Sequence, residues 1–229
     1  MKPLIIAIDG PSGAGKGTVA RALAKRLGYR YLDTGAMYRA VAWKAAHDGL
    51  PLDDERAVAA LAEKAMLHVG GNGVRIDGHD VTSAIRTAAI DRAATVTARL
   101  PNVRAALVAR QRKAGANGGI VMEGRDVGTV VFPNADVKIY LDASPEERAR
   151  RRAADPAHGV GKQAALADVA SELQARDLSD STRAASPLAK APDAILVDTT
   201  NLTIDQVVER VMGIVEERLA SRESKVEGH

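Results

Sequence analysis

The 229-residue chain has no cysteine and few aromatic residues. Without cysteine it can form neither a disulfide nor a thiolate metal site. Aromatic side chains make up 3% of the residues, and Trp43 and Phe132 are the single tryptophan and phenylalanine. If the protein recognises a nucleobase, we therefore expect hydrogen bonds to contribute more than stacking on aromatic rings.

Long apolar runs and an excess of one charge are also absent. No run approaches the roughly 20 residues that a transmembrane helix needs. The apolar start of the chain ends at Asp9, so we expect no secretory signal. The net charge is +3, from 32 basic and 29 acidic residues, which requires neither a nucleic acid nor a membrane as partner. We expect a cytoplasmic protein whose partners are small molecules.

The most informative segment is a glycine-rich loop between a predicted strand at 4–9 and a predicted helix at 16–27. Its sequence is Gly10-Pro11-Ser12-Gly13-Ala14-Gly15-Lys16-Gly17-Thr18. The glycines let successive backbone N–H groups converge on phosphate oxygens, while the helix N-terminus and Lys16 add positive charge. The Thr18 hydroxyl is suited to Mg²⁺ or to a phosphate. Strand, glycine loop and helix together predict a P-loop that binds a nucleoside triphosphate.

Helical and strand-like segments alternate through most of the chain, which predicts an α/β fold with a parallel sheet. The predicted strands lie near 4–9, 30–32, 119–122, 137–141 and 194–198. The predicted helices cover about 16–27, 36–48, 55–66, 101–114, 145–154, 163–182 and 204–220. Within 67–85, a Gly-Asn-Gly turn between alternating residues predicts a small antiparallel hairpin inserted into this core. We expect the tail at 221–229 to be frayed and flexible.

Two polar turns follow predicted strands, at the edge where open α/β sheets bind ligands. In the first, Asp33 and Thr34 precede a helix in which Arg39 can reach back over the turn. Capping of this helix by Asp33 or Thr34, with Arg39 in solvent, is the simpler interpretation.

The second turn is Glu123-Gly124-Arg125-Asp126, after the strand at 119–122. Glu123 stands where P-loop proteins often place an acid near the metal. The Asp126 carboxylate can accept hydrogen bonds, and the neighbouring Arg125 guanidinium can donate several. The alternative is a structural salt bridge within the turn, since such pairs are common and individually weak.

Two groups of arginines lie on later predicted helices. The helix at 145–154 has a clear start at Ser144 and Pro145, and one face carries Arg148, Arg151 and Arg152. On the next helix, Arg176, Asp180 and Arg183 are spaced i, i+4, i+7. Simpler interpretations are a solvated face with a Glu147–Arg151 pair, and an intrahelical Arg176–Asp180 pair. Beside a P-loop, a hinged lid that neutralises the transferring phosphoryl group explains the first group.

Taken together, these segments resemble the bacterial cytidylate kinase family over about residues 4–220. The loop ends Gly-Lys-Gly-Thr, as in nucleoside-monophosphate kinases rather than GTPases. The other matching segments are Asp33–Arg39, Val81–Thr87 and Gly124–Pro133. The resemblance implies a P-loop NTPase parallel sheet flanked by helices, a small antiparallel insert in the monophosphate-binding region and a short helical lid. It also implies ATP-dependent phosphorylation of CMP and dCMP with Mg²⁺, by a monomer.

The resemblance also divides the single kinase unit into regions. The core covers about 1–33, 101–145 and 185–220. The region that binds the nucleoside monophosphate (NMP) covers about 34–100 and the lid about 146–184.

The resemblance further assigns roles to residues. Residues 10–18 hold the ATP phosphates, with Lys16 catalytic, and Arg39 and Arg125 hold the CMP phosphate. Three arginines close over the phosphates: Arg148, Arg152 and Arg176. The cytosine-reading positions are Thr95, Arg104 and Asp126, and the pair on the sugar is Asp180 and Arg183. Thr34, in the acceptor site, and Thr95 stand where the family commonly has serine, and Glu123 replaces a frequent aspartate.

Two other functions compete with this interpretation. One is a different small P-loop kinase, acting on UMP, another nucleoside monophosphate or an alcohol such as shikimate. The positions of Arg104, Asp126 and the Asp180–Arg183 pair argue against it. The other is a nucleotide-dependent switch protein. GTPase switches need an Asn-Lys-x-Asp segment to read guanine, and no lysine follows an asparagine in this chain.

The P-loop interpretation predicts the effect of Lys16→Ala. The variant loses the mobile positive charge at the phosphates, so phosphoryl transfer should be abolished with every acceptor. ADP release from ATP and Mg²⁺ in the presence of CMP measures this loss. Turnover near that of the unaltered protein would show that residues 10–18 do not hold the reacting phosphates.

Overall fold

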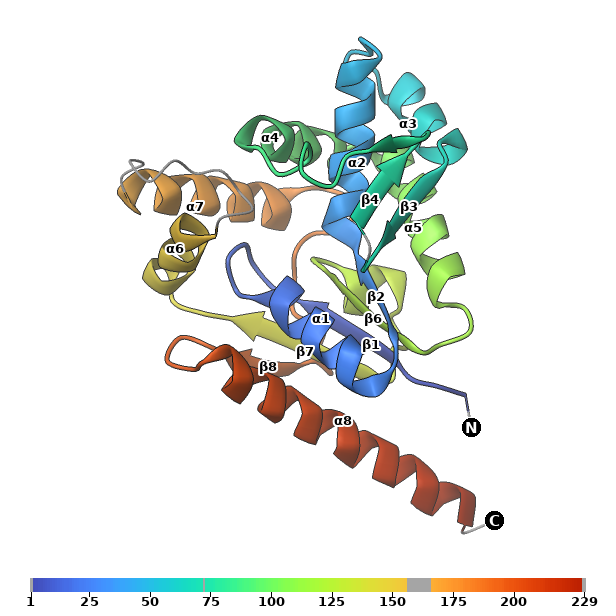
Figure 1. Cartoon of the computed structure of the whole chain (residues 1–229), viewed down its shortest axis with the longest axis vertical. Coiled ribbons are helices and arrows are strands. Elements are labelled where there is room, and N and C mark those ends of the chain that lie inside the picture. The colour runs from blue at the N-terminus through green and yellow to red at the C-terminus, as the bar shows by residue number, and fades with distance from the viewer. Residues whose placement is uncertain (1, 72, 156–165, 228–229) are drawn as a thin grey trace.

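The computed structural model describes residues 2–71, 73–155 and 166–227 (Figure 1). Its centre is a sheet of five parallel strands in the order β2-β6-β1-β7-β8. The strands are β1 (Ile5–Asp9), β2 (Arg30–Asp33), β6 (Ile120–Gly124), β7 (Val137–Asp142) and β8 (Ile195–Asp198). The predicted strands and the parallel sheet are confirmed. Their register sets Glu123 beside both Ile8 and Asp33, so polar residues from separate segments meet at the carboxyl edge.

Helices cover both faces of this sheet (Figure 1). They are α1 (Lys16–Leu27), α2 (Thr34–His47), α3 (Glu55–Lys64), α4 (Ala88–Thr97), α5 (Pro101–Gly115), α6 (Pro145–Ala154), α7 (Leu166–Thr182) and α8 (Ile204–Glu227). Alternate residues of β1 supply the two cores. Ile6 and Ile8 pack in a cluster with α1 and α8, while Ala7 packs in a second cluster with α2 and α5. Burial on both faces explains the continuous apolar run of β1.

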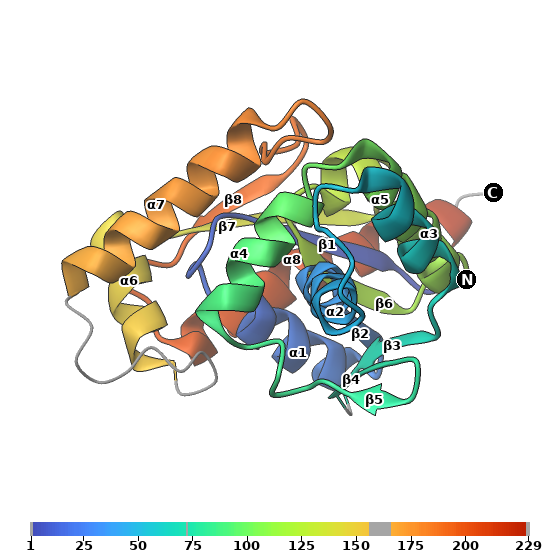
Figure 2. The same cartoon turned by 90° about the horizontal axis from the view of Figure 1, so that it is seen from above.

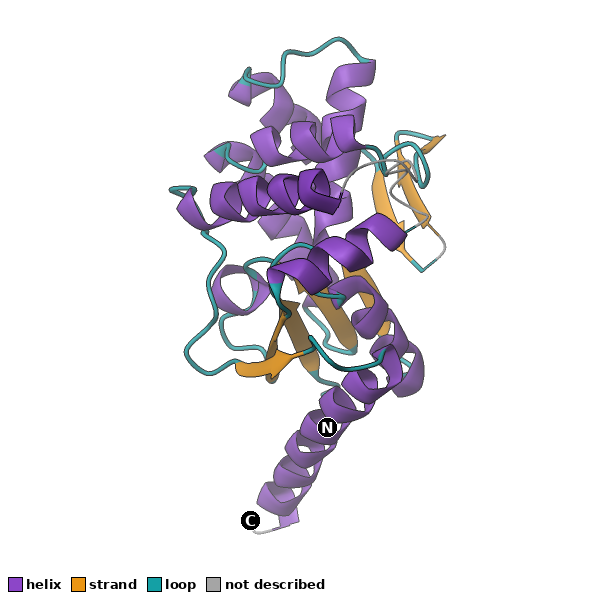
Figure 3. Cartoon of the chain, turned by 90° about the vertical axis from the view of Figure 1, so that its left-hand side faces the viewer, coloured by secondary structure: helices purple, strands orange, loops and turns teal. Residues whose placement is uncertain are grey.

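The predicted insert is present as a separate antiparallel sheet (Figure 3). It consists of β3 (Leu67–Gly70), β4 (Gly73–Ile76) and a short third strand, β5 (His79–Asp80). The third strand and the following helix α4 were not predicted. Thr87 is the N-cap of α4, and its hydroxyl accepts a hydrogen bond from the N–H of Ile90. The helix is short and rich in alanine, and Ile90 and Val96 are its only large apolar residues, so it shows little hydrophobic periodicity.

The end of the chain differs from the prediction. Helix α8 continues to Glu227 instead of fraying from Ser221. Arg222 anchors this extension by donating to the backbone oxygen of Lys2, at 3.2 Å, and pairing with Asp136. The first residues of the predicted helix at 163–182 and the last two of the tail lie outside the described residues.

A π-helical turn over Val127–Val131 was also not predicted.

Helices α6 and α7 lie side by side at the edge of the molecule (Figures 1 and 2). They pack on one another through a small apolar cluster of Ala149, Val169 and Leu173, distinct from the two main clusters. Across residues 2–71, 73–155 and 166–227, no helix has the length and apolar character needed to cross a membrane.

The packing predicts opposite effects for two glycine substitutions. Gly213 lies inside α8 with no atom within 4 Å of an added Cβ, so Gly213→Ala should raise the free energy of unfolding by about 1 kcal/mol. At Gly118, φ is +69° and an added Cβ would lie 2.0 Å from the backbone oxygen of Pro3. Gly118→Ala should therefore lower the free energy of unfolding by more than about 1 kcal/mol. Urea unfolding of both variants measures the difference, and equal midpoints would contradict this packing.

Candidate active site

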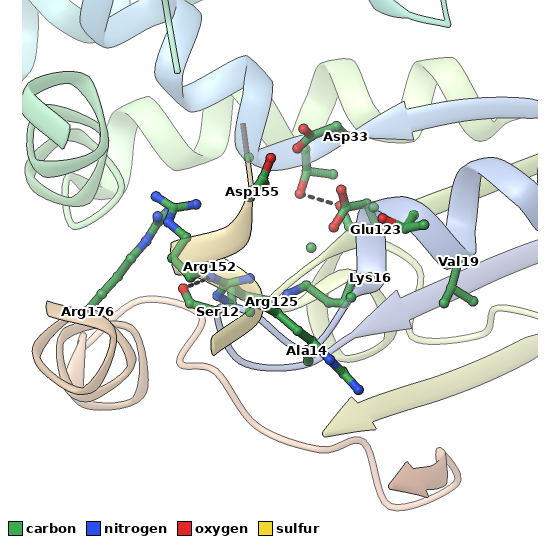
Figure 4. Close-up of a pocket in the computed structure, with 18 of the residues that line it drawn as sticks. Ser12, Ala14, Lys16, Val19, Asp33, Glu123, Arg125, Arg152, Asp155 and Arg176 are labelled. Atoms are coloured by element: carbon green, nitrogen blue, oxygen red, sulfur yellow. Dashed lines mark hydrogen bonds between the residues drawn. The ribbon is translucent and has the colours of Figure 1, made fainter. Parts of the chain in front are cut away.

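A cavity of about 600 Å³ lies at the carboxyl edge of the large sheet (Figure 4). Of the residues assigned by resemblance, those that line it are Ser12, Gly13, Ala14, Gly15, Lys16, Gly17, Thr18, Thr34, Arg39, Thr95, Arg104, Arg125, Asp126, Arg152, Arg176, Asp180 and Arg183. Gly10, Pro11 and Arg148 lie outside this lining. The structure therefore brings segments from across the chain to one space.

The glycine-rich loop has the backbone that a phosphate cradle needs. Gly13 and Gly15 have φ values of +79° and +88°, a region that side chains with a Cβ disfavour. Gly15 is also the N-cap of α1 and offers no capping side chain, so the first N–H groups of the helix are available to an anion. At Gly13, an added Cβ would lie 2.7 Å from the backbone oxygen of Arg148, so α6 contacts the loop closely.

Lys16 is buried at the base of this loop, and its Nζ donates to the backbone oxygen of Pro11 at 2.7 Å. Burial, and secondly the nearby Arg125 guanidinium, lower the pKa of Lys16 to about 7. A bound triphosphate would reverse this shift, because its negative charge favours the ammonium form. Lys16 is therefore poised to become fully charged as an anion binds.

Asp33 organises the first polar turn. Its Oδ1 accepts from the N–H of Ala36 at 2.8 Å, which caps α2, and its Oδ2 lies 2.8 Å from Arg39 Nη2. Burial opposes ionisation, but Arg39 and Arg86 outweigh it and lower the pKa of Asp33. Capping and placement of Arg39 thus occur together, and Arg39 is buried at the cavity instead of lying in solvent.

A chain of buried ion pairs runs across the cavity. Arg104 pairs with Asp126, whose Oδ1 lies 3.5 Å from Arg183 Nη2. Arg183 Nη1 lies 3.4 Å from Asp180 Oδ1, and Asp180 Oδ2 lies 2.9 Å from Arg125 Nε. Arg125 Nη2 then donates to the Ser12 hydroxyl at 2.7 Å. Arg125 thus pairs with Asp180, and Asp126 pairs with Arg104 and Arg183, so the alternative of a salt bridge within the turn is wrong.

The lid arginines have partners that the sequence did not reveal. Arg176 lies 3.2 Å from Asp91 of α4, which also pairs with Arg152. The resemblance implies that Arg148 closes over the phosphates. Its Nη1 instead donates to the backbone oxygen of Ser12 at 3.0 Å and pairs with Asp177. Arg176 therefore pairs with Asp91, whereas Asp180 pairs with Arg125 and Arg183, so the interpretation of Arg176 as paired within its helix to Asp180 is wrong.

The expected pair between Glu147 and Arg151 is present, at 2.7 Å. Arg151 also donates to Thr199 and lines the cavity. The start of α8 contributes Ile204 and Val207 to the lining, a contact that no local sequence pattern indicated.

Asp9 is a further residue that sequence reasoning missed. Its carboxylate accepts from the N–H groups of Val127 and Gly128, at 2.9 and 2.7 Å. Burial raises the pKa of Asp9 to about 6. Asp9 therefore holds the turn that carries Arg125 and Asp126 against the end of β1.

Thr18 and Glu123 are the residues suited to Mg²⁺. A Cβ at Gly17 would lie 3.0 Å from Glu123 Oε1, so this carboxylate lies against the P-loop. Burial, and secondly Asp33, raise the pKa of Glu123, and a cation would relieve both effects. The structure's described part holds no cluster of three or more potential metal-ligating acids or histidines. A carboxylate and a hydroxyl nevertheless fit Mg²⁺, which usually takes its other ligands from water and phosphates.

The fold and this cavity define a P-loop nucleotide-binding protein of the small-kinase class. A family described as cytidylate kinase matches residues 6–217. The cytidylate kinase of Solibacter usitatus is 47% identical over 96% of this chain and 95% of its own length. That of a Geobacillus species is 49% identical over 93% and 97%. The chain belongs to the cytidylate kinase family.

A solved structure with low sequence identity to this chain has a similar fold. A gluconokinase from Sinorhizobium meliloti 1021 covers 100% of this chain and 99% of its own, with a TM-score of 0.51 and 15% identity. At that identity, the likeness concerns the fold alone.

The lowered pKa of Lys16 predicts that ATP binding takes up a proton. At about pH 8 the free protein holds most of its Lys16 neutral, so binding should take up about one proton, and almost none at about pH 6. Affinity should fall as the pH rises above about 7. Titration calorimetry in buffers of different ionisation enthalpy measures the uptake. Lys16→Met should abolish it, and unchanged uptake in that variant would assign the proton to another group.

Proposed function

We propose that the protein transfers the terminal phosphoryl group of ATP to CMP or dCMP, giving ADP and CDP or dCDP. The observation that carries this proposal is a single cavity whose lining includes both the P-loop and the Arg104–Asp126 pair. ATP phosphates at Lys16 and a CMP whose base lies at Asp126 would then share one space, so the CMP phosphate could reach the donor. Family membership supports the same reaction.

The polar groups at the Asp126 end fit a cytosine. Cytosine presents an amino donor beside nitrogen and carbonyl acceptors, which match a carboxylate acceptor and a guanidinium donor. Asp126 Oδ1 has only a long contact, at 3.5 Å, with Arg183, so it can accept from an amino group. Arg104 supplies the donor fork, and Thr95 lines the same space. Uracil would present the wrong group to the carboxylate.

Buried donors without partners also support a polar ligand. The hydroxyl of Tyr38 and the Nε atoms of Arg39 and Arg104 are buried and have no hydrogen-bond partner among the described residues. All three residues line the cavity. Buried polar groups are rarely left unsatisfied in native proteins, so we assign these donors to the acceptor nucleotide.

The reaction needs positioning and charge neutralisation more than a general base. The attacking phosphate of CMP is already anionic near neutral pH. Arg39 and Arg125 would orient it, while Lys16, Arg152 and Arg176 would stabilise the charge that develops on the transferred group. Thr18 and Glu123 would hold Mg²⁺, which when bound would offset the negative charge of the ATP phosphates. Arg148 would contribute indirectly, because its hydrogen bond to the backbone oxygen of Ser12 holds the lid against the P-loop.

We also propose the context in which the enzyme works. It acts as a monomer in the cytoplasm, in pyrimidine nucleotide metabolism, and needs no nucleic-acid partner. The alternative acceptors, another nucleoside monophosphate or a shikimate-type alcohol, are not favoured by the family match.

A panel of acceptors tests this function. ADP release from ATP and Mg²⁺ would be measured with CMP, dCMP, UMP, AMP, GMP, dTMP and shikimate in separate reactions. We expect strong turnover with CMP and dCMP alone. A preference for another acceptor would contradict the roles of Thr95, Arg104 and Asp126 while leaving the P-loop assignment intact.

The base-reading role predicts a selective effect of Asp126→Ala. Loss of the acceptor for the cytosine amino group should lower kcat/KM for CMP by roughly tenfold to a hundredfold and narrow the gap to UMP. Asp193→Ala is the matched control, because Asp193 is an exposed partner of Lys138. It should leave the CMP-to-UMP ratio unchanged. An unchanged ratio in Asp126→Ala would assign base recognition to other residues.

A further inference from the structure

The lid is attached to the rest of the molecule mainly by polar contacts. Its helices α6 and α7 share their own apolar cluster, which is separate from the two main cores. On the P-loop side, Arg148 and Asp177 form hydrogen bonds with Ser12, and the backbone of Arg148 lies close to Gly13. On the NMP-binding side, the lid faces α4, which lies beside α7 (Figure 2). Hydrogen bonds and ion pairs therefore set the position of the lid.

Asp91 is the buried contact between α4 and both lid helices. Its side chain is 9% exposed, and it pairs with Arg152 of α6 and, at 3.2 Å, with Arg176 of α7. Figure 4 shows the two arginine side chains coming together from their separate helices. Both arginines line the cavity, whereas Asp91 does not. The carboxylate therefore contacts both guanidinium groups without itself lining the cavity.

This arrangement gathers positive charge toward the cavity. Two guanidinium groups held close together repel one another, and a shared carboxylate offsets that repulsion. Burial lowers the pKa of Arg176, and Asp91 is the largest influence in the opposite direction. Two cations and one anion leave a net positive charge, which suits a polyphosphate. Removing the carboxylate would leave both cations partly buried without this partner.

Asp91 is also joined to the residues that face the acceptor. Thr95 lies one turn further along α4, and its hydroxyl donates to the backbone oxygen of Asp91 at 2.9 Å. Ala98 ends the same helix, and its backbone oxygen accepts from Arg104 Nη1 at 3.3 Å. Thr95, Ala98 and Arg104 all line the cavity. A nucleotide that orders this part of α4 thereby orders the carboxylate that holds the lid arginines.

We propose that Asp91 is a positioning residue that holds Arg152 and Arg176 over the transferring phosphoryl group. Through α4, it couples occupation of the acceptor site to closure of the lid over the donor. This inference rests on the phosphate-binding roles proposed above for the two arginines.

The first test is Asp91→Asn in the full chain. Misplacement of catalytic groups by about 1 Å can cost on the order of a hundredfold in rate, so kcat should fall by roughly tenfold to a hundredfold while KM for CMP changes little. Binding of CMP is then measured with and without a non-hydrolysable ATP analogue. The analogue should tighten CMP binding in the unaltered protein, and this enhancement should largely disappear in the variant.

Glu172→Gln is the matched control. Glu172 on α7 faces Arg92 on α4 at 3.9 Å, so it spans the same two helices, but its side chain is 65% exposed. This variant should keep both kcat and the enhancement of CMP binding. Asp91→Glu retains the charge and should give values between those of the unaltered protein and Asp91→Asn. It also provides the comparison if Asp91→Asn does not fold. If Asp91→Glu has a kcat and an enhancement of CMP binding no higher than those of Asp91→Asn, a role for the carboxylate is contradicted.

A double-mutant cycle separates this inference from the proposed function. The variant Arg152→Ala/Arg176→Ala should lose kcat, and adding Asp91→Asn should then cause no further loss. Full activity without the two arginines would overturn their proposed roles. If Arg152→Ala/Arg176→Ala loses activity but Asp91→Asn keeps it, the proposed roles of the arginines stand and only the positioning role of Asp91 is overturned. A further loss on adding Asp91→Asn would show that Asp91 acts through the fold and not through these arginines.

Discussion

The structure of the site depends on carboxylates that neutralise a cluster of buried cationic side chains. Lys16 and five arginines line one cavity: Arg39, Arg104, Arg125, Arg176 and Arg183. Without counter-charges these cations would repel each other, and burying them away from water would cost free energy. Asp33, Asp91, Asp126 and Asp180 pair with these arginines. Such pairs add little net stability, but losing one partner leaves a buried charge uncompensated. These pairs also fix the positions of the arginines that line the cavity.

The apolar packing and the charged layer have separate tasks. The two main clusters hold the sheet between its helices and give it a rigid carboxyl edge. Asp9, Asp33 and Glu123 stand at the ends of three neighbouring strands of that sheet, so their spacing follows from the strand register. The lid has only a small apolar cluster of its own. Its position therefore depends on polar contacts with the P-loop and with α4, which a charged ligand can alter.

Much of the fold could be predicted from local patterns. The apolar run of β1, the glycine loop and α1 are contiguous, and each element shows its own periodicity. The insert was recognisable from its turn. Helix α4 was missed because it is short and its alanines give little hydrophobic periodicity, and a helix of ten residues depends on tertiary contacts for its stability. The extension of α8 was missed because its anchor, the contact of Arg222 with Lys2 and Asp136, joins the two ends of the chain.

The sequence by itself determined the P-loop, the parallel sheet and the residue types that a phosphoryl-transfer site requires, because these depend on neighbours along the chain. Only the tertiary structure decided which carboxylate holds which cation. Asp91 meets Arg152 across 61 positions, and Asp177 accepts from the N–H of Ser12 across 165. Spacing along a helix indicated a different partner for Arg176, since it reports neighbours on one element alone. Ion pairs between elements depend on how the helices pack, and that packing is set by apolar contacts distributed over the whole chain.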